Sequence, residues 1–207
     1  MSSKTVILAD GSYPEHEIPL GYLRNALRII CCDGSAEILV SKGFTPEAVV
    51  GDLDSLSQEI AQQFPDRLFK DVEQKTNDLT KTVKWCVNKG YTDIVILGAT
   101  GKREDHTIGN ISLLAEYAKD TDIMMVTDTG VFTPHLKSSK FSSFPGQQIS
   151  IFSINPETRI TSVGLKYRLN KMKLHNWWEA TLNEATGDSF ELSFKKGPLI
   201  VYQKFRD

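Results

Sequence analysis

The sequence predicts an α/β fold followed by an all-β module, with a mostly parallel sheet and helices on both of its faces. From Thr5 to Val126, short apolar runs alternate with longer amphipathic stretches. After about Thr133 the helical periodicity stops, and short strand-like runs follow one another. The charge changes near the same place. Residues 1–137 carry 14 Lys and Arg against 20 Asp and Glu, whereas residues 138–207 carry 10 against 6.

Six short apolar runs are predicted to form the buried strands of the sheet. Runs this short, without an alternating polar face, are typical of strands that are covered on both faces. The predicted strands are Thr5–Ala9, Arg28–Cys32, Ala48–Val50, Arg67–Phe69, Asp93–Leu97 and Asp122–Val126.

Five amphipathic stretches between these runs are predicted to be helices. In the stretch Asp78–Lys89, the apolar residues Leu79, Val83, Cys86 and Val87 recur at helical intervals. Because strands that alternate with helices form βαβ units, neighbouring strands are expected to be parallel. The predicted helices are Leu20–Leu27, Ala36–Lys42, Gln58–Phe64, Asp78–Lys89 and Thr107–Lys119.

The last third of the chain is predicted to be a small β module. Pro134, the stretch SSKFSSFPG and Gly146 indicate a linker or boundary, so we expect domains at 1–135 and 140–207. So short a module has a thin core and is expected to pack on the first domain or on a second subunit. Its predicted strands are Gln148–Ile154, Arg159–Gly164, Lys171–Leu174, Ser189–Phe194 and Leu199–Phe205.

Composition excludes several classes of protein. The chain has 207 residues, 40% of them hydrophobic and 24% charged, which is typical of a globular protein. No apolar run approaches the roughly 18 residues of a membrane span, and a net charge of −2 gives no case for nucleic-acid binding. Three cysteines form no disulfide framework and no common zinc pattern, and the start of the chain has no signal-peptide pattern. We therefore expect a cytoplasmic protein.

Acidic residues and glycines follow the predicted strands. In an open parallel sheet, ligands bind at the carboxyl ends of the strands. The first strand is followed by Asp10 and Gly11, and the second by Asp33 and Gly34. These residues are therefore expected to lie on one edge of the sheet.

Asp52 and Asp54, after the third strand, form the strongest pair. In an extended chain, residues two apart point to the same side with Cα atoms about 6–7 Å apart. Two carboxylates so placed suit Mg²⁺, which takes one or two carboxylates together with waters and phosphates. The alternative is structural, with Asp52 as a helix cap and Asp54 in a turn. Asp33, Asp78 and Asp105 at neighbouring strand ends favour the metal.

The segment after the fifth strand is a candidate phosphate loop. Gly98 and Gly101 allow backbone N–H groups to approach an anion, and a helix begins close behind. Arg103 is suited to bind phosphate oxygens with two hydrogen bonds. The alternative is a plain turn with Asp105 as the helix N-cap, and His106 is then structural.

Three further residues are candidates for contacts with an organic ligand. Gln74 is suited to hydrogen-bond a polar heterocycle, although loop glutamines are usually only solvated. Trp177 and Trp178 are adjacent, so at most one is expected in the local core, and the other is free for stacking or for a subunit interface.

Together these motifs resemble the thiamine pyrophosphokinase family over nearly the whole chain. In the second module, matching pieces recur in the same order as in the family. The quoted motifs are Asp33-Gly34, Gly51-Asp52-Leu53-Asp54-Ser55, Gln74 with Asp78-Leu79-Thr80-Lys81, Gly98…Gly101…Arg103…Asp105-His106, Gly164–Leu169, Asn183-Glu184-Ala185…Gly187-Asp188 and Gly197-Pro198-Leu199.

The resemblance implies a Rossmann-like domain, a small C-terminal β-sandwich domain and a homodimer with thiamine near the interface. It implies transfer of pyrophosphate from ATP to the hydroxyethyl group of thiamine, giving thiamine diphosphate and AMP. The first domain, 1–135, is then the ATP- and Mg²⁺-binding part, and 140–207 binds thiamine and forms the dimer. Alternatives are another Mg²⁺-dependent phosphotransferase or phosphohydrolase, or a non-catalytic thiamine or nucleotide sensor.

The resemblance also implies roles for single residues. It does not decide which of Asp54, Asp78 and Asp105 acts as the general base. Many relatives have Asp-x-Thr-Asp where this chain has Lys75-Thr76-Asn77-Asp78, and often Ser-Thr-Ser-Asn where it has Ala180-Thr181-Leu182-Asn183. The implied catalytic residues are Asp54, Asp78, Arg103 and Asp105; the metal ligands Asp52, Asp54, Asp78 and Asp33; the ATP and phosphate contacts Asp10, Gly11, Asp33, Gly34, Gly98, Gly101, Arg103 and His106; and the thiamine contacts Gln74, Trp177, Trp178, Thr181 and Asn183.

Overall fold

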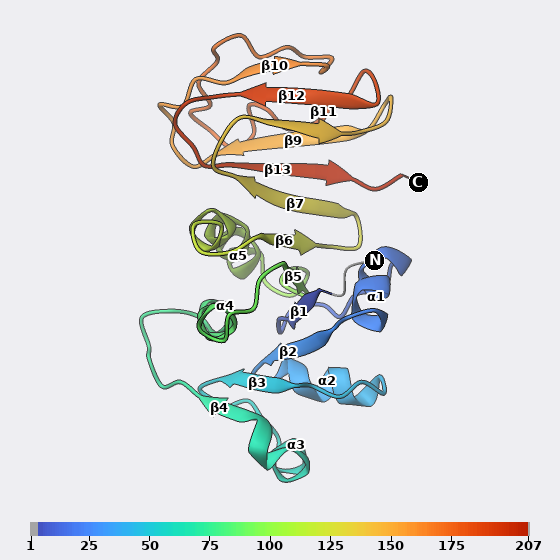
Figure 1. The fold of residues 1–207 in the computed structure, drawn as a ribbon, viewed down its shortest axis with the longest axis vertical. Coiled ribbons are helices and arrows are strands. Elements are labelled where there is room, and N and C mark those ends of the chain that lie inside the picture. The colour runs from blue at the N-terminus through green and yellow to red at the C-terminus, as the bar shows by residue number, and fades with distance from the viewer. Residues whose placement is uncertain (1–3, 207) are drawn as a thin grey trace. The chain divides into compact units, whose positions relative to one another are not determined.

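A computed structural model describes residues 4–206, which form two compact units. Of the described residues, the first unit contains 4–113 together with 120–128, and the second contains 114–119 and 129–206. Figure 1 gives the elements of both. None of the helices in the described chain is long and apolar enough to cross a membrane.

The first unit is built on a parallel sheet, as predicted. Every pairing between its neighbouring strands is parallel, and the order is β6-β5-β1-β2-β3-β4. All four residues of β1 and all four of β5 are buried. Neither strand has an exposed polar face, because the sheet is covered on both sides there. The strands are β1 (Thr5–Leu8), β2 (Arg28–Cys32), β3 (Ala48–Gly51), β4 (Leu68–Lys70), β5 (Ile94–Leu97) and β6 (Ile123–Val126).

Each predicted helix is present, with small shifts of the ends. The first begins earlier than predicted because the side chain of His16 accepts a hydrogen bond from the backbone N–H of Ile18. The helices are α1 (Glu17–Arg24), α2 (Ser35–Ser41), α3 (Gln58–Gln63), α4 (Asp78–Asn88) and α5 (Glu104–Tyr117), with a short 3₁₀ turn at Pro65–Arg67.

The strand order creates a topological switch point between β1 and β5. From β1 the chain adds β2, β3 and β4 on one side, and β5 then pairs with the other side of β1. The loops after β1 and β5 therefore leave the sheet in opposite directions and open a crevice at its carboxyl edge.

The three cysteines lie in the core of this unit, as expected for small apolar residues. Cys31, Cys32 and Cys86 are buried and unpaired by disulfides. Burial raises the pKa of Cys31 and of Cys86 to about 12, so both thiols stay protonated at neutral pH.

The second unit consists of antiparallel strands in two sheets. One has the order β11-β9-β13-β7 and the other β10-β12-β8. Apolar residues of both sheets, among them Ile151, Phe190 and Val201, form one buried cluster. The strands are β7 (Gly130–His135), β8 (Ser139–Ser142), β9 (Gln148–Ser153), β10 (Thr161–Val163), β11 (Asn183–Glu184), β12 (Ser189–Ser193) and β13 (Leu199–Lys204).

Three expectations about this unit were wrong. Pro134 was predicted to mark a linker or boundary, but it lies in β7 and pairs with Ile200 of β13. The serine-rich stretch was predicted as a linker, but it forms β8, because Phe141 points inward and stacks on Phe190 with ring centroids 4.5 Å apart. A single apolar residue among polar ones gave too weak an alternation to indicate a strand. Lys171–Leu174 was predicted as a strand, but only Met172 forms an isolated bridge, to Ile160.

Candidate functional site

A cavity of about 280 Å³ opens at the carboxyl edge of the parallel sheet. The loops after β1, β2 and β5 and the first turns of α4 and α5 surround it. It therefore lies at the switch point, where a doubly wound sheet binds its ligand. Predicted site residues that line it are Asp10, Gly11, Asp33, Gly34, Asp78, Arg103 and His106.

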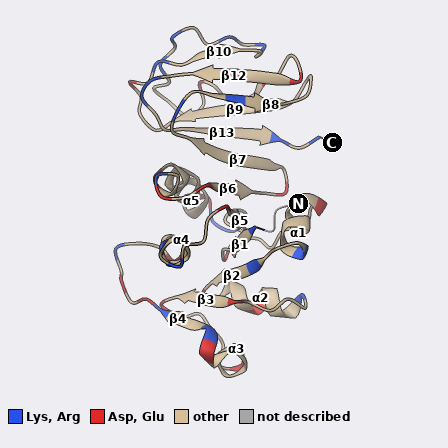
Figure 2. Ribbon diagram, in the orientation of Figure 1, with Lys and Arg blue, Asp and Glu red and all other residues tan. Residues whose placement is uncertain are grey.

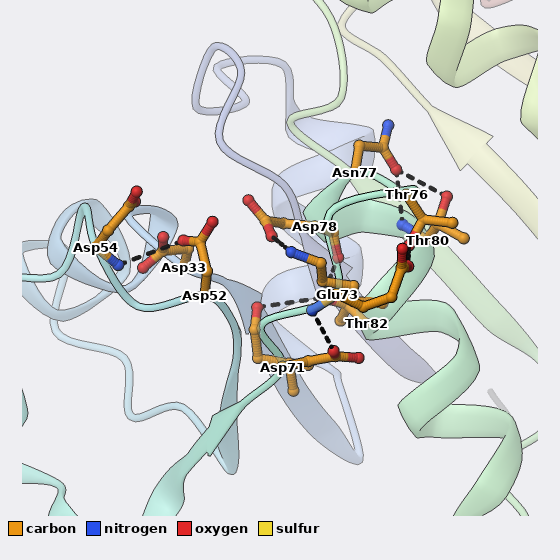
Figure 3. Close-up of polar contacts among 12 residues, drawn as sticks. Asp33, Asp52, Asp54, Asp71, Glu73, Thr76, Asn77, Asp78, Thr80 and Thr82 are labelled. Atoms are coloured by element: carbon orange, nitrogen blue, oxygen red, sulfur yellow. Dashed lines mark hydrogen bonds and ion pairs between the residues drawn. The ribbon is translucent and has the colours of Figure 1, made fainter.

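Three carboxylates gather beside this cavity (Figure 3). Asp33, Asp52 and Asp54 each offer an oxygen, and these oxygens lie within 4.8 Å of one another. The geometry differs from the predicted extended pair, because Leu53 has a φ of 62° and bends the chain into a turn. Within this turn the backbone N–H of Asp54 donates to Asp52 Oδ1 at 3.3 Å.

Asp33 is the buried member of this carboxylate cluster. It is 4% exposed, and its Oδ1 has no hydrogen-bond partner among the described residues. Burial raises its pKa to about 6, with further increases from the hydrogen bond to Asp52 and the negative charge of Asp78. A buried carboxylate oxygen that accepts no hydrogen bond from the described residues is free to bind a cation.

Asp52 has the opposite electrostatic setting. The hydrogen bond from the backbone of Asp54 lowers the pKa of the Asp52 carboxyl. A carboxylate that is ionised at neutral pH therefore sits next to the buried Asp33. Carboxylate oxygens at this separation are the hard ligands that Mg²⁺ prefers, so the residues present fit the predicted metal.

Asp78 approaches the carboxylate cluster from α4. Its carboxylate accepts a hydrogen bond from Lys81 Nζ at 2.9 Å, and the side chain of Lys81 is only 4% exposed. The approach depends on Gly51, because an added Cβ there would lie 2.9 Å from the Cβ of Asp33 and 3.4 Å from Asp78 Cγ. Asp78 is not among the three residues whose oxygens are mutually close.

Lys81 balances part of this negative charge. Burial lowers the pKa of its ammonium group, but the hydrogen bond to Asp78 and the charges of Asp78, Asp52 and Asp71 outweigh that effect. The net pKa is raised, so Lys81 is a permanent cation under the site. The prediction from sequence missed it as a site residue, although it follows Asp78 by three positions, which is the spacing of helix neighbours.

Glycines tie the loops after β1 and β5 together. The backbone N–H of Gly11 donates to the carbonyl of Gly98 at 2.6 Å, and that of Ser12 to Thr100 at 2.8 Å. A Cβ at Gly11 would lie 2.3 Å from the Gly98 oxygen, and Gly101, with a φ of 93°, leaves no room for one beside Ser12. The predicted phosphate loop is therefore a close backbone crossing that only glycine allows.

The charged residues of this loop are paired with one another. Arg103 donates two hydrogen bonds to Asp105, from Nε at 3.1 Å and from a terminal nitrogen at 2.6 Å. This contact lowers the pKa of Asp105 to about 2. Lys102 pairs with Asp10 at 2.8 Å. All four side chains are more than half exposed, so both cations can reach a ligand in the cavity.

Two asparagines connect the parts of the site, and neither was predicted. Asn77 caps α4 by accepting from the backbone of Thr80 at 2.9 Å, and its amide donates to Asn110 at 3.1 Å. Asn110 in turn donates to the carbonyl of Ala99 at 2.9 Å. The position of Asn77 just before a predicted helix was a signal for a cap. Asn110 lies mid-helix, and no pattern indicated it.

The predicted thiamine contacts lie outside this cavity's lining. Gln74 is exposed. Trp177 is half-buried with its ring 5.6 Å from that of Phe152, whereas Trp178 is 72% exposed, so one of the two is free for a ligand or interface. The hydroxyl of Thr181 donates to the carbonyl of Trp178 at 2.8 Å.

Asn183 has a structural environment. It is 2% exposed, and its amide donates to the carbonyl of Tyr167 and accepts from the backbone N–H of the same residue. These two hydrogen bonds at 2.8 and 3.1 Å hold the Tyr167 backbone in place. Its predicted contact with thiamine stays a prediction.

Two family descriptions match the chain. "Thiamin pyrophosphokinase, catalytic domain" matches residues 21–127, which is more than half of the chain. "Thiamin pyrophosphokinase, substrate-binding domain" matches residues 130–202.

Individual proteins agree with these matches. The thiamine pyrophosphokinase of Bacillus subtilis is 28% identical over 96% of this chain and 97% of its own length. Thiamin pyrophosphokinase 1 of Caenorhabditis elegans is 26% identical over 70% of this chain, which spans 65% of that protein. The crystal structure of thiamin pyrophosphokinase from Geobacillus thermodenitrificans has a TM-score of 0.78, with 26% identity and 98% of each chain covered.

Proposed function

This chain belongs to the thiamin pyrophosphokinase family, and from that premise we propose how its residues carry out the reaction. It is an enzyme that transfers the pyrophosphoryl group of ATP to thiamine, giving thiamine diphosphate and AMP. The hydroxyl of thiamine must therefore meet the β-phosphorus of ATP in line with the bond that breaks. Such a transfer depends mainly on alignment and on neutralising the charge of the phosphates.

The observation that carries the proposal is the carboxylate cluster with its unpartnered buried oxygen. Asp33, Asp52 and Asp54 would hold Mg²⁺, with Asp78 as the fourth candidate ligand from α4. When bound, Mg²⁺ neutralises phosphate charge and orients the phosphate chain. The carboxylates themselves orient the ion, and Lys81 holds Asp78 in place.

The phosphate chain would lie between this cluster and the loop after β5. Arg103 donates two hydrogen bonds to Asp105 and keeps three further N–H groups for phosphate oxygens, and the glycine loop brings backbone close to the ligand. The proposed ATP contacts are Asp10, Gly11, Asp33, Gly34, Gly98, Gly101, Arg103 and His106.

The electrostatics narrow the choice of general base. A base must accept a proton from the thiamine hydroxyl, and a carboxyl with a pKa of about 2 is poorly suited to hold one. We therefore favour Asp54 or Asp78 over Asp105 for that role. Asp105 then acts by orienting Arg103.

We propose that residues of the second unit, together with Gln74, bind thiamine. The exposed ring of Trp178 is suited to stack on the thiazolium cation, with Trp177, Thr181 and Asn183 nearby in sequence. We propose that residues 1–135 form the ATP- and Mg²⁺-binding domain and residues 140–207 the thiamine-binding and dimerisation domain. The proposed assembly is a homodimer, and the proposed location is the cytoplasm.

An assay for AMP tests the function. The purified protein would receive ATP and Mg²⁺ with and without thiamine, and the products would be separated by chromatography. Thiamine-dependent AMP with an equal amount of thiamine diphosphate is the expected result. ADP instead of AMP would mean transfer of the γ-phosphoryl group and would overturn the mechanism. Thiamine binding in calorimetry without any turnover would point to a sensor.

A further inference from the structure

The second unit contains a basic groove. None of the residues proposed above to bind ATP, Mg²⁺ or thiamine lies in its lining. Its volume is about 940 Å³. Of the described residues that line it, Glu157 is the one acid. The five cations, hereafter the groove cations, are Arg159, Lys171, Lys173, Lys195 and Lys196. They are half of the ten Lys and Arg between residues 138 and 207, and Figure 2 shows basic segments on the loops next to β10.

The backbone brings three of the groove cations together from two segments. Ile160 and Met172 form an antiparallel bridge, with N–H to O distances of 2.8 and 3.0 Å. This bridge places Lys171 and Lys173 on either side of Met172 and next to Arg159. Their proximity is therefore fixed by main-chain hydrogen bonds and does not depend on chance side-chain rotamers.

The other two groove cations come from the segment after β12. Ser193 at the end of β12 pairs with Thr161 of β10, so Lys195 and Lys196 leave the sheet beside the same strand. The hydroxyl of Thr158 donates to the carbonyl of Lys196 and fixes that segment. Three separate stretches of chain thus converge on one groove.

The charges of this groove are poorly compensated. Glu157 pairs with Lys173. Arg159, Lys171 and Lys195 are exposed and have no ion-pair partner within residues 4–206. Like charges held side by side repel one another, so ion pairing within the fold does not explain why the cations without a partner gather here.

We propose that the groove is an auxiliary binding site for small oligophosphate anions, such as the phosphate chain of a nucleoside triphosphate or of a diphosphate ester. Several ammonium groups and one guanidinium match the charge of such a chain. The groove has the size of a small-molecule site. Its one aromatic lining residue, Phe194, is 7% exposed and offers no platform for stacked bases, which disfavours single-stranded nucleic acid.

Calorimetric titration with inorganic tripolyphosphate, without divalent metal, tests this site in the full chain. The double variant Lys171→Ala/Lys195→Ala should bind the probe about tenfold more weakly at the groove or not at all. The matched control is Lys140→Ala/Lys166→Ala, which removes two exposed lysines of the same unit that pair with Glu191 and Glu184 outside the groove. It should bind like the unaltered protein.

A second variant separates this site from the ATP site. Arg103→Ala should remove any binding of tripolyphosphate at the switch-point cavity and leave the groove event unchanged. If Arg103→Ala abolishes the groove event, the auxiliary site is overturned. If Arg103→Ala leaves binding at the switch-point cavity unchanged, the phosphate contact of Arg103 in the proposed function is overturned and the groove is unaffected. Titrations with ATP and with thiamine diphosphate show which of the two supplies the phosphate chain.

Three outcomes would overturn the proposal. The groove double variant binds tripolyphosphate as the unaltered protein does. A 12-nucleotide single strand binds through the same lysines more tightly than tripolyphosphate does. The double variant changes the sedimentation coefficient, which would make the groove a subunit interface. Since the variant removes repelling charges, its Tm should equal or exceed that of the unaltered protein, so misfolding would be recognised.

Discussion

The carboxylate cluster and the basic groove are both concentrations of like charge, but the chain builds them differently. In the cluster, turns and a glycine bring Asp33, Asp52 and Asp54 within 4.8 Å, and one of them is buried. In the groove, exposed side chains such as Lys171 project into solvent from irregular segments next to β10 and β12.

This difference decides how much each site depends on its ligand. Solvent screens the groove cations, so their repulsion is small. The buried carboxylate is screened much less, and its pKa is raised accordingly. We therefore expect variants of the cluster to have large effects on activity and stability, and variants of the groove to affect ligand binding alone.

The largest effect is expected for the cluster's exposed pair. Asp52→Ala and Asp54→Ala should each lower kcat by about 100-fold or more, because each removes a proposed ligand of the cation that neutralises the phosphates. Steady-state AMP formation at saturating Mg²⁺ measures this. Near-normal activity in both variants would remove the metal assignment.

A smaller loss is expected at the phosphate loop. Arg103→Lys keeps the charge but loses the planar pair of donors seen toward Asp105, so kcat should fall about 10- to 100-fold. Arg24→Lys is the control, since Arg24 also pairs with an acid on the surface but lies outside the site. If both variants turn over at the unaltered rate, Arg103 is only a surface charge.

The pKa of Asp33 predicts how stability changes with pH. The pKa in the folded protein is about 6, above the ordinary value of 3.8, so the folded state holds the proton more tightly. The resulting contribution to the free energy of unfolding is full below about pH 4 and is lost as the pH rises through about 6.

Urea unfolding of metal-free protein between pH 4 and 8 measures this change. Relative to Asp33→Asn, the unaltered protein should lose roughly 2–3 kcal/mol over that range, and excess Mg²⁺ should restore stability above pH 6. Asp66→Asn, an exposed carboxyl outside the site, should follow the unaltered protein. Parallel curves for Asp33→Asn and the unaltered protein would contradict the prediction.

The smallest effect is expected from the asparagine bridge. Asn110→Ala leaves the amide of Asn77 and the carbonyl of Ala99 without their partner, at a cost of about 1–2 kcal/mol in unfolding free energy. The KM for ATP should rise several-fold, because the bridge holds α4 against the loop after β5. Asn170→Ala, at an exposed position, should change neither quantity. An unchanged KM in Asn110→Ala would limit the bridge to a structural role.

The sequence predicted those parts of the fold that depend on strong local patterns. Continuous apolar runs located all six parallel strands, and the residues after them located Asp33, Asp52 and Asp78 at the correct edge. β8 escaped prediction because its inward face in the core is one residue, Phe141. Strand pairing with β12 stabilises it, and such a contact between distant segments leaves no local pattern.

The site was less predictable in its geometry than in its composition. The positive φ of Leu53 draws Asp52 and Asp54 toward Asp33, and nothing in the residue type of leucine indicates that conformation. Asn110 and the buried position of Lys81 depend on how α5 and α4 meet the sheet. These features arise only once the tertiary structure brings distant segments together.

The crossing of Gly11 over Gly98 has a consequence for how such an enzyme can change over evolutionary time. Any side chain at Gly11 would collide with two carbonyl oxygens, those of Gly98 and Thr100. Substitution there cannot be relieved by a rotamer change, because backbone atoms are the obstacle. We therefore expect glycine to be the one residue accepted at this position during evolution. A change in the preferred phosphate donor would have to come from substitutions at neighbouring positions such as Lys102, whose exposed side chain leaves room for other residues.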